Sequence, residues 1–99
     1  TIPIEFSDLG LARFAHDAPR PDLVIADPTA LDQVDGASLA RSGMETLVHA
    51  VEAFANPGYH PPADALALDA VRRLAIWLPA AVRPRLDREA RREALAGAL

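Results

Sequence analysis

The chain has 99 residues and a formal net charge of −4, and 51% of its residues are hydrophobic but only 5% aromatic. This length and apolar share fit one small unit with a core of Ala, Leu, Val and Ile, a composition that favours helices. The acidic balance argues against nucleic acid as a partner, and the absence of cysteine excludes disulfides and thiolate metal sites.

No stretch resembles a signal peptide, and no apolar run approaches the roughly 20 residues that a membrane span needs. We therefore expect a cytoplasmic protein that has no membrane partner. All ten basic residues are arginine, which indicates a GC-rich and hence bacterial coding sequence.

The first six residues alternate in polarity, with Ile2, Ile4 and Phe6 on one side. This period of two predicts a half-buried strand, and Pro3 confines it to a sheet edge or a strand end. The segment that follows, residues 7–21, is predicted to be irregular.

A second, buried strand is predicted at the apolar run Leu23–Ala26, which Asp27-Pro28 closes. Thr29–Gly36 is predicted to be a loop, and residues 37–41 a short helical turn. Because two short strands make a poor sheet by themselves, we expect them to be the last strands of a larger one.

The strongest helical pattern runs from Ser42 to about Ala55, where Asn56-Pro57-Gly58 stops it. The apolar face of this helix is predicted to pack against a core and consists of Met44, Leu47, Val48, Val51 and Phe54. A second helix is predicted to be capped by Asp64, with Pro79 ending or kinking it.

A third helix is predicted from about Asp87. Its apolar side would contain Ala90, Ala94 and Leu95. Its arginines are expected to be solvated: Arg88, Arg91 and Arg92.

Glu45 and His49 of the central helix are four residues apart. At 3.6 residues per turn they lie one above the other, close enough to bind one metal ion or to hydrogen-bond each other. Carboxylate and imidazole groups are ligands of zinc and iron, although such a site needs at least three protein ligands. The pattern Ser42-x-x-Glu45 equally fits a capping box, in which Glu45 only stabilises the helix start.

The other polar candidates are interpreted as ordinary surface residues. Glu52, one turn beyond His49, is expected to be a solvated acid or to lie next to the ligands without binding the metal. His16 and His60 lie in loops, although His60 could reach a site on the neighbouring helix. His49 taken alone also fits an ordinary helix histidine with a hydrogen-bond partner.

Residues 43–54 read Gly-Met-Glu-Thr-Leu-Val-His-Ala-Val-Glu-Ala-Phe and resemble the GMDALTHAIEAY helix of the iron-containing (group III) alcohol dehydrogenases. Upstream, residues 21–28 resemble the strand of that family that ends in Asp-Pro, and the distance to the helix fits without a gap. Downstream, residues 63–71 and 78–82 resemble the family's next helix. The likeness covers most of residues 21–95.

This resemblance implies a two-domain enzyme with a dehydroquinate synthase-like architecture. Residues 1–36 would form the C-terminal end of an α/β nucleotide-binding domain, and residues 37–99 the start of an all-helical metal-binding domain. The fold class expected for this chain is therefore mainly α with a short β portion. The metal and the substrate would lie in the cleft between the two domains.

By the same resemblance, Glu45 and His49 are metal ligands, and the loop residues Ala30, Leu31 and Val34 approach a nicotinamide cofactor. The implied cofactors are a divalent metal, iron or zinc, and NAD or NADP. The implied function is that of an alcohol dehydrogenase or aldehyde reductase, whose metal acts as a Lewis acid on the substrate oxygen during hydride transfer. Its partners would be a small alcohol or aldehyde, the remainder of the enzyme chain and, if it self-associates, further copies in a homo-oligomer.

Departures from the family pattern leave alternatives open. The family has aspartate where this chain has Glu45, and related sugar-phosphate cyclases use a glutamate ligand, so a metal-dependent cyclase or lyase is a second hypothesis. The family's glycine-rich pyrophosphate-binding elements and two further histidine ligands are not among these 99 residues, so we interpret the chain as an internal fragment. The third hypothesis is a non-catalytic helical remnant or interaction module, in which Glu45 only caps its helix.

Overall fold

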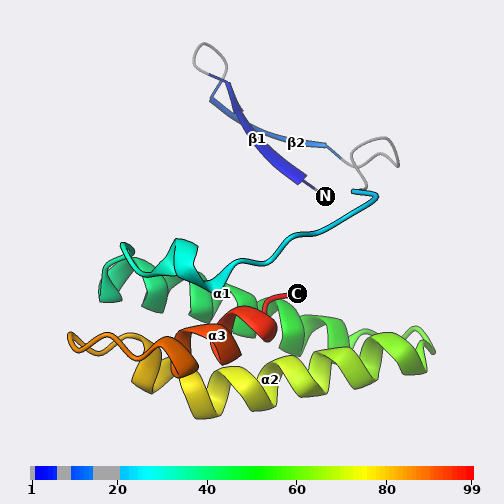
Figure 1. The fold of residues 1–99 in the computed structure, drawn as a ribbon. Helices are drawn as coiled ribbons and strands as arrows, with labels where there is room; N and C mark the ends of the chain where they lie inside the picture. Colours follow the sequence, from blue (N-terminus) through cyan, green and yellow to red (C-terminus); the bar gives the residue numbers. More distant parts are fainter. Residues whose placement is uncertain (1, 7–9, 15–20) are drawn as a thin grey trace.

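The computed structural model describes residues 2–6, 10–14 and 21–99 of the chain (Figure 1). A β-hairpin comes first, followed by a 3-10 turn and three α-helices. The elements in chain order are β1 (Ile2–Phe6), β2 (Gly10–Phe14), η1 (Pro28–Leu31), α1 (Gly36–Ala55), α2 (Pro61–Ala81) and α3 (Arg88–Ala96). None of the helices among these residues is long and apolar enough to cross a membrane.

The three helices form the packed part of the molecule. The two long helices, α1 and α2, lie side by side and run in opposite directions, and the shorter α3 turns back against α2 (Figure 1). The turn η1 contacts α3. The predicted helical character of the region after residue 36 is confirmed.

The core of these helices is built from small and branched aliphatic side chains. Its buried members are Leu39, Ala50, Ala67, Leu74, Leu78, Ala81 and Ala90. Leu74 is only 2% exposed, and alanine at several contact points lets the helix backbones approach closely. Gly36 lies at the closest such approach, because a Cβ atom there would stand 2.3 Å from the Val82 carbonyl oxygen.

Helix α1 begins six residues earlier than predicted. The Asp35 carboxylate caps it by accepting a hydrogen bond from the Ser38 amide at 2.9 Å, and the pKa of Asp35 is lowered by the hydrogen bonds from Ser38. The predicted capping box at Ser42 and Glu45 is therefore wrong. Both residues lie inside the helix, where the Ser42 carbonyl accepts a bond from Thr46 Oγ1 at 2.9 Å. Nothing between residues 36 and 41 stops a helix, so it extends back to the first good cap.

The start of α2 was also misassigned. His60, predicted to be a plain loop residue, caps the helix through Nδ1, which accepts a hydrogen bond from the Ala63 amide at 3.2 Å. Asp64, the predicted cap, lies in the first turn, where its negative charge interacts favourably with the positive end of the helix dipole. Pro79 does not end α2 at once, since the helix continues to Ala81.

The third helix begins where it was predicted. The Asp87 carboxylate accepts a hydrogen bond from the Ala90 amide at 3.0 Å and so caps α3. One arginine of this helix contradicts the prediction of a fully solvated set, because Arg91 is only 5% exposed. Arg91 lies three and four residues before Ala94 and Leu95, so it shares the helix face that packs inward.

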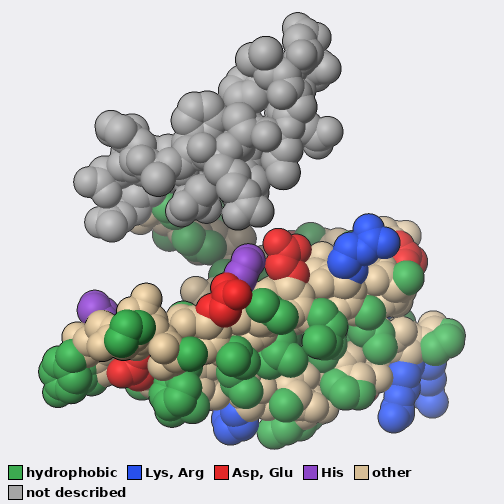
Figure 2. All heavy atoms as spheres, turned by 180° about the vertical axis from the view of Figure 1, so that it is seen from behind, with side chains coloured by type: hydrophobic (Ala, Val, Ile, Leu, Met, Phe, Trp, Pro, Cys, Tyr) green, Lys and Arg blue, Asp and Glu red, His purple; other side chains and the backbone are tan. Residues whose placement is uncertain are grey.

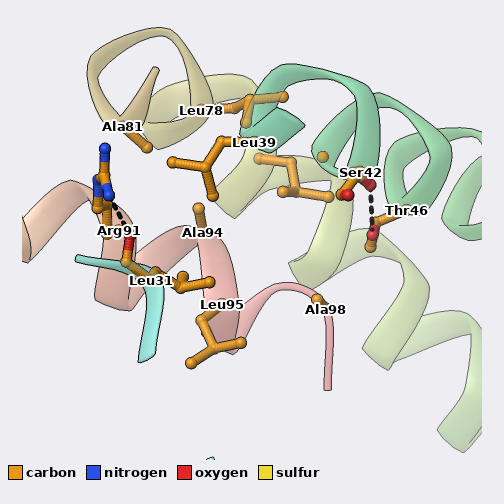
Figure 3. A pocket seen from close by; sticks show the side chains of 12 residues that line it. Leu31, Leu39, Ser42, Thr46, Leu78, Ala81, Arg91, Ala94, Leu95 and Ala98 are labelled. Carbon is orange, nitrogen blue, oxygen red and sulfur yellow. Dashed lines mark hydrogen bonds between the residues drawn. The ribbon is translucent and has the colours of Figure 1, made fainter. Parts of the chain in front are cut away.

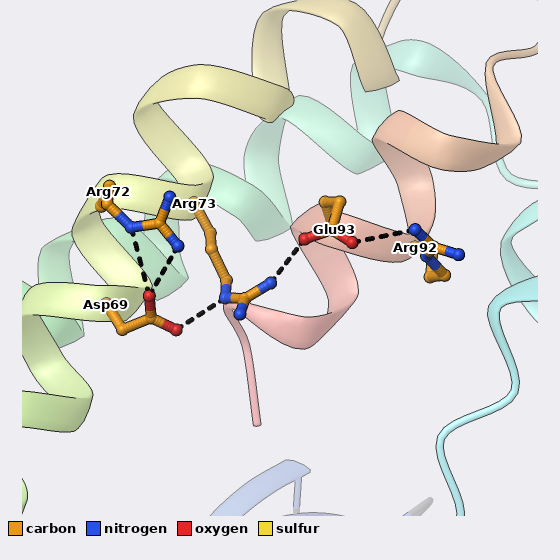
Figure 4. A network of polar contacts seen from close by, with 5 residues as sticks. All are labelled: Asp69, Arg72, Arg73, Arg92 and Glu93. Atoms are coloured by element: carbon orange, nitrogen blue, oxygen red, sulfur yellow. Dashed lines mark hydrogen bonds and ion pairs between the residues drawn. The ribbon is translucent and has the colours of Figure 1, made fainter.

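An ion-pair network joins α2 to α3 (Figure 4). Asp69 accepts bonds from Arg72 at 2.8 Å and from Arg73 at 2.6 Å, and the second of these arginines also reaches Glu93 of α3 at 2.5 Å. Glu93 completes the network with Arg92 at 3.1 Å. Hydrogen bonds from the two α2 arginines lower the pKa of Asp69, and Asp69 in turn raises the pKa of Arg73.

The N-terminal residues confirm the first predicted strand and contradict the prediction of an irregular segment after it. The strand predicted over residues 1–6 is found as β1, but the region predicted to be irregular contains β2, antiparallel to it, with residues 2 and 14 paired. A lone strand leaves its backbone groups unpaired, so β1 pairs with the nearest extended segment. The rest of that irregular region, residues 7–9 and 15–20 with His16, lies outside the described residues.

The buried strand predicted at Leu23–Ala26 is not formed. Leu23, Val24 and Ile25 are 75%, 60% and 83% exposed, and the segment has no regular structure. A short apolar run becomes a buried strand only between neighbouring strands, and no described strand pairs with this one.

Candidate metal centre

Glu45 and His49 both lie on α1 and are exposed. They stand one turn apart, so their side chains leave the same side of the helix. Neither makes a hydrogen bond or ion pair to another residue that the structure describes. In the view from behind, histidine and acidic side chains lie together along the upper edge of the helices, above a broad area of apolar side chains (Figure 2).

The donor chemistry of this pair fits two positions of a metal site. A carboxylate oxygen and an imidazole nitrogen both ligate divalent zinc and iron, and here both groups are accessible. Over residues 2–6, 10–14 and 21–99, no three His, Cys, Asp or Glu side chains are grouped closely enough to hold a metal ion. The described residues therefore offer two candidate ligands here, and a complete site needs at least one more.

The capping explanation for Glu45 loses its basis in this structure. A capping box places its glutamate three residues after the cap, whereas Glu45 is ten residues after Asp35, the observed cap. Glu45 thus has no part in starting α1. Glu52, the next acidic residue on the helix, is exposed, which fits its interpretation as a solvated acid.

An open hollow of about 370 Å³ lies beside His49. It is bounded by the C-terminal half of α1, the N-terminal half of α2 and the residues after α3, with Leu66 and Leu99 among its lining side chains. Its walls are mostly alanine, and His49 is the one imidazole that borders it. A mostly apolar hollow bordered by one imidazole resembles the surroundings of small-molecule sites in general.

A second, smaller cavity of about 100 Å³ lies between the helices (Figure 3). Its lining is almost entirely apolar and includes Leu31, Leu39 and Leu95, with Arg91 at one end. Neither Glu45 nor His49 borders this cavity. It is a packing space of the helical core and is separate from the candidate metal centre.

The predicted cofactor loop begins in the short 3-10 turn η1, which contains Ala30 and Leu31, and Val34 follows it. Asp27 caps it, with the Thr29 amide and hydroxyl donating to its carboxylate at 2.9 and 2.7 Å, and these bonds lower the pKa of Asp27. The three predicted cofactor residues are not equivalent. Ala30 is exposed, whereas Leu31 and Val34 are half-buried and joined by a backbone hydrogen bond of 3.0 Å.

Two arginines of α3 that were predicted to be solvated contact this turn or the residue after it. Arg91 donates through Nη1 to the carbonyl of Leu31 (Figure 3), and Arg88 donates to the Asp32 carboxylate at 2.8 and 3.0 Å. The signal that could have placed Arg91 inside was its position on the Ala94–Leu95 face. Nothing in the sequence pairs Arg88 with a residue 56 positions earlier.

Residues 39–99 match the family model for the C-terminal part of the Fe-containing alcohol dehydrogenase family. The match covers all of α2 and α3 and most of α1. The chain belongs to this family.

Several curated proteins of known activity are similar to this member of the Fe-containing alcohol dehydrogenase family. A 4-hydroxybutyrate dehydrogenase of Cupriavidus necator is 34% identical over 71 residues, which are 72% of this chain and 19% of that protein. A long-chain-alcohol dehydrogenase of Geobacillus thermodenitrificans is 36% identical over 77% of this chain and 19% of its own length. An NAD-dependent methanol dehydrogenase of Bacillus methanolicus is 37% identical over 77% of this chain and 20% of its own length.

The chain spans about a fifth of the length of these relatives. No solved structure matches it significantly. The family resemblance predicted from residues 43–54 is confirmed, and the three helices agree with the helical C-terminal part of the Fe-containing alcohol dehydrogenases.

Proposed function

We propose that this chain is part of a metal-dependent, NAD(P)-linked alcohol dehydrogenase or aldehyde reductase. The observation that carries the proposal is the position of Glu45 and His49, which are exposed one turn apart on α1 within the matched family region. The names of the relatives support it, because each denotes a dehydrogenase and one is called NAD-dependent. The substrate would be a small alcohol or aldehyde, and the enzyme would work in the cytoplasm.

In this proposal the chain contains parts of two domains. Residues 1–36 belong to the end of an α/β nucleotide-binding domain, and residues 37–99 begin the helical metal-binding domain. The family match beginning at residue 39 supports this division. The metal and the substrate would lie between the two domains, with η1 on the cofactor side.

Glu45 and His49 would hold a divalent iron or zinc ion together with ligands from elsewhere in the complete enzyme. Such an ion supplies Lewis acidity toward the substrate oxygen, and the nicotinamide exchanges the hydride. The contribution of this chain is position. The two side chains project from a 20-residue helix whose inner face is buried against α2, so their spacing is fixed before any ligand arrives.

The segment from Ala30 through Leu31 to Val34, which is the end of η1 and the residues after it, would lie on the nicotinamide side. Ala30 is the exposed member, and its small side chain leaves room for a planar ring. Leu31 and Val34 are half-buried and would instead fix the shape of the turn. Exclusion of water from the reacting atoms would then depend on the domain that faces α1.

One competing function has an observation in its favour. Glu45 stands where the resembling dehydrogenases have aspartate, and glutamate reaches one methylene further. A metal-dependent cyclase or lyase of the wider superfamily would use the same ligand pair without net hydride transfer to a substrate. The relatives above are all called dehydrogenases, which favours the first proposal.

The test uses the full-length protein that carries this segment, with Glu45→Gln and His49→Ala as separate variants. Bound metal is measured by elemental analysis, and activity by nicotinamide absorbance with a series of primary alcohols and aldehydes. Each variant should lose bound metal and at least on the order of 100-fold in activity, since even residues that only support ligands cost 10–100-fold. Glu89→Gln, an exposed glutamate of α3, is the matched control and should leave both unchanged.

Two outcomes separate the rival functions. Full metal content and activity in both variants would show that Glu45 and His49 are not ligands. Metal loss in the variants, combined with a wild-type protein that turns over no alcohol or aldehyde with either NAD or NADP, would instead support the cyclase or lyase. The non-catalytic hypothesis requires a wild-type protein without stoichiometric metal.

A further inference from the structure

Arg91 is a buried charged residue among the described helices. It is 5% exposed, and an arginine keeps its charge at any ordinary pH. Burial of a charge is costly unless hydrogen bonds compensate, and an apolar residue would fill the same space at lower cost. Arg91 donates to the Leu31 carbonyl, while its Nε atom has no partner among the described residues. The bond to Leu31 is thus what the arginine provides at this position.

The carbonyl that Arg91 binds is the last one of η1. The same oxygen accepts the Val34 amide at 3.0 Å, so it connects the end of the turn to the segment leading into α1. A four-residue 3-10 helix has few hydrogen bonds of its own and needs tertiary contacts to hold one geometry. Arg91 supplies such a contact from α3.

A second contact fixes the neighbouring residue of the turn. Arg88, one turn earlier on α3, donates from Nε and Nη2 to the same Asp32 carboxylate oxygen at 3.0 and 2.8 Å. Consecutive residues, Leu31 and Asp32, are therefore held by two arginines of one helix face. Arg88 is itself exposed, so its ion pair is weaker than the buried bond of Arg91.

We propose that Arg91 is a positioning residue for the nicotinamide cofactor. It holds the Leu31 carbonyl on α3 and thereby sets the geometry of the turn beside which the cofactor would lie, with Arg88 and Asp32 as a secondary support. The inference rests on the proposed function, because the cofactor role of η1 is part of that proposal. Arg91 itself does not touch the cofactor or the reacting atoms.

The experiment compares Arg91→Met, Arg91→Lys and Arg92→Met in the full-length enzyme. Methionine keeps most of the aliphatic volume but cannot donate to Leu31, whereas lysine retains one donor. Arg92 is the matched control, since it is an exposed arginine at the next position and bonds only to Glu93 among the described residues. The Michaelis constant for the cofactor, kcat, and metal content are measured for each.

Arg91→Met should raise the KM for NAD or NADP by up to about tenfold, the factor reached when the full free energy of the lost bond to Leu31 is transferred to cofactor binding. Its kcat at saturating cofactor and its metal content should stay close to those of the wild type. Arg91→Lys should recover part of the loss, and Arg92→Met should behave as the wild type. Unchanged cofactor KM in Arg91→Met would overturn the proposal, and so would an equal fall in kcat and metal content, because that indicates general loss of structure.

Hydrogen exchange separates this inference from the proposed function. The amides of Ala30, Asp32 and Val34 should exchange faster in Arg91→Met than in the wild type, because their bonds belong to the turn that Arg91 holds. Unchanged exchange would refute the claim that Arg91 holds the turn. Faster exchange in a protein without nicotinamide-dependent activity would refute the proposed function and, with it, the role of Arg91 in cofactor binding.

Asp32→Asn keeps the proposal testable if Arg91→Met fails to fold. This variant weakens the exposed ion pair with Arg88 and buries no unpaired charge. It should raise the cofactor KM in the same direction by a smaller factor, about twofold, as surface ion pairs are weak. If Asp32→Asn changes neither the cofactor KM nor amide exchange in the turn, this result would contradict the proposal that contacts from α3 hold the turn.

Discussion

The inner and outer faces of the two long helices differ in how far their apolar side chains are buried. The inner face is closed within the described residues, where Leu39, Leu74 and Leu78 are 9%, 2% and 9% exposed. The outer face carries large apolar side chains that are about half exposed or more. They are Met44, Val48, Val51, Phe54, Leu66, Leu68 and Ile76. The prediction that the apolar face of α1 is buried is therefore wrong for the described residues, because its first four members in this list are about half exposed.

The candidate metal ligands lie on the outer face. Glu45 and His49 are exposed along with the apolar side chains of α1, which in Figure 2 spread below the polar edge. A contiguous apolar surface of this kind marks a place where further polypeptide or a ligand packs. The packing that gives α1 its position is thus local to these helices, whereas the proposed metal site on its outer side would need ligands beyond the two candidates on α1.

Removal of one core side chain gives the largest expected effect on the inner face. Leu74→Ala should lower the free energy of unfolding by about 2–5 kcal/mol, because it leaves a cavity in a fully buried position. Leu66→Ala makes the same truncation on the same helix at a position that is 73% exposed, and should cost within about 0.5 kcal/mol.

Urea denaturation of the full-length protein measures both changes. A small effect for Leu74 would contradict the assignment of the inner face as the core. A loss of unfolding free energy in Leu66→Ala close to that in Leu74→Ala would show that the outer face is covered in the complete protein.

A close backbone contact at the end of the inner face gives the next largest effect. In Gly36→Ala the new Cβ would meet the Val82 carbonyl oxygen at 2.3 Å, and a backbone atom cannot move aside as a side chain can. The expected loss is about 1–3 kcal/mol, typical of overpacking. In Gly58→Ala the nearest neighbour of the new Cβ is a side-chain oxygen of Asn56 at 3.2 Å, so this variant should cost less, and urea denaturation of the full-length protein measures both. Equal losses at the two glycines would contradict the contact.

The smallest effect is expected from the partly exposed ion-pair network between α2 and α3. Because hydrogen bonds from Arg73 and Arg72 lower the pKa of Asp69, its folded-state pKa lies below the ordinary 3.8. The unfolded chain then binds the proton more readily, so this carboxylate stabilises the fold above about pH 3.8 and the contribution is lost as pH falls through the lower, folded pKa.

Asp69→Asn should therefore be less stable than the wild type at neutral pH and lose less stability on acidification. Denaturation at a series of pH values from neutral down to the acid limit measures this, with Asp22→Asn as a control that breaks no ion pair among described residues. A variant whose stability falls with acid as steeply as that of the wild type would argue against a role for Asp69.

Local signals predicted the parts of this fold that a few neighbouring residues decide. The end of α1 at Asn56-Pro57-Gly58 and the start of α3 at Asp87 follow from a breaker and a cap. The start of α1 was missed because Ser42 and Asp35 are both good caps, and the Ser42-x-x-Glu45 pattern suggested the inner one. Only the absence of a breaker after Asp35 decides between them.

Features that depend on residues distant in sequence could not be predicted in the same way. The segment Leu23–Ala26 has the composition of a buried strand, but a strand forms only beside a partner. The burial of Arg91 depends on the fold of the turn 60 residues earlier. The pair Glu45 and His49 was identified from spacing and family resemblance, and the structure adds that both are accessible and that neither starts the helix.

The most direct test of the central claim is anomalous diffraction from crystals of the full-length protein, recorded on both sides of the iron and zinc absorption edges. The account predicts one metal peak per chain, within bonding distance of the Glu45 carboxylate and the His49 imidazole, about 2.0–2.2 Å from each ligand atom. A metal held by protein ligands that include neither residue would contradict it.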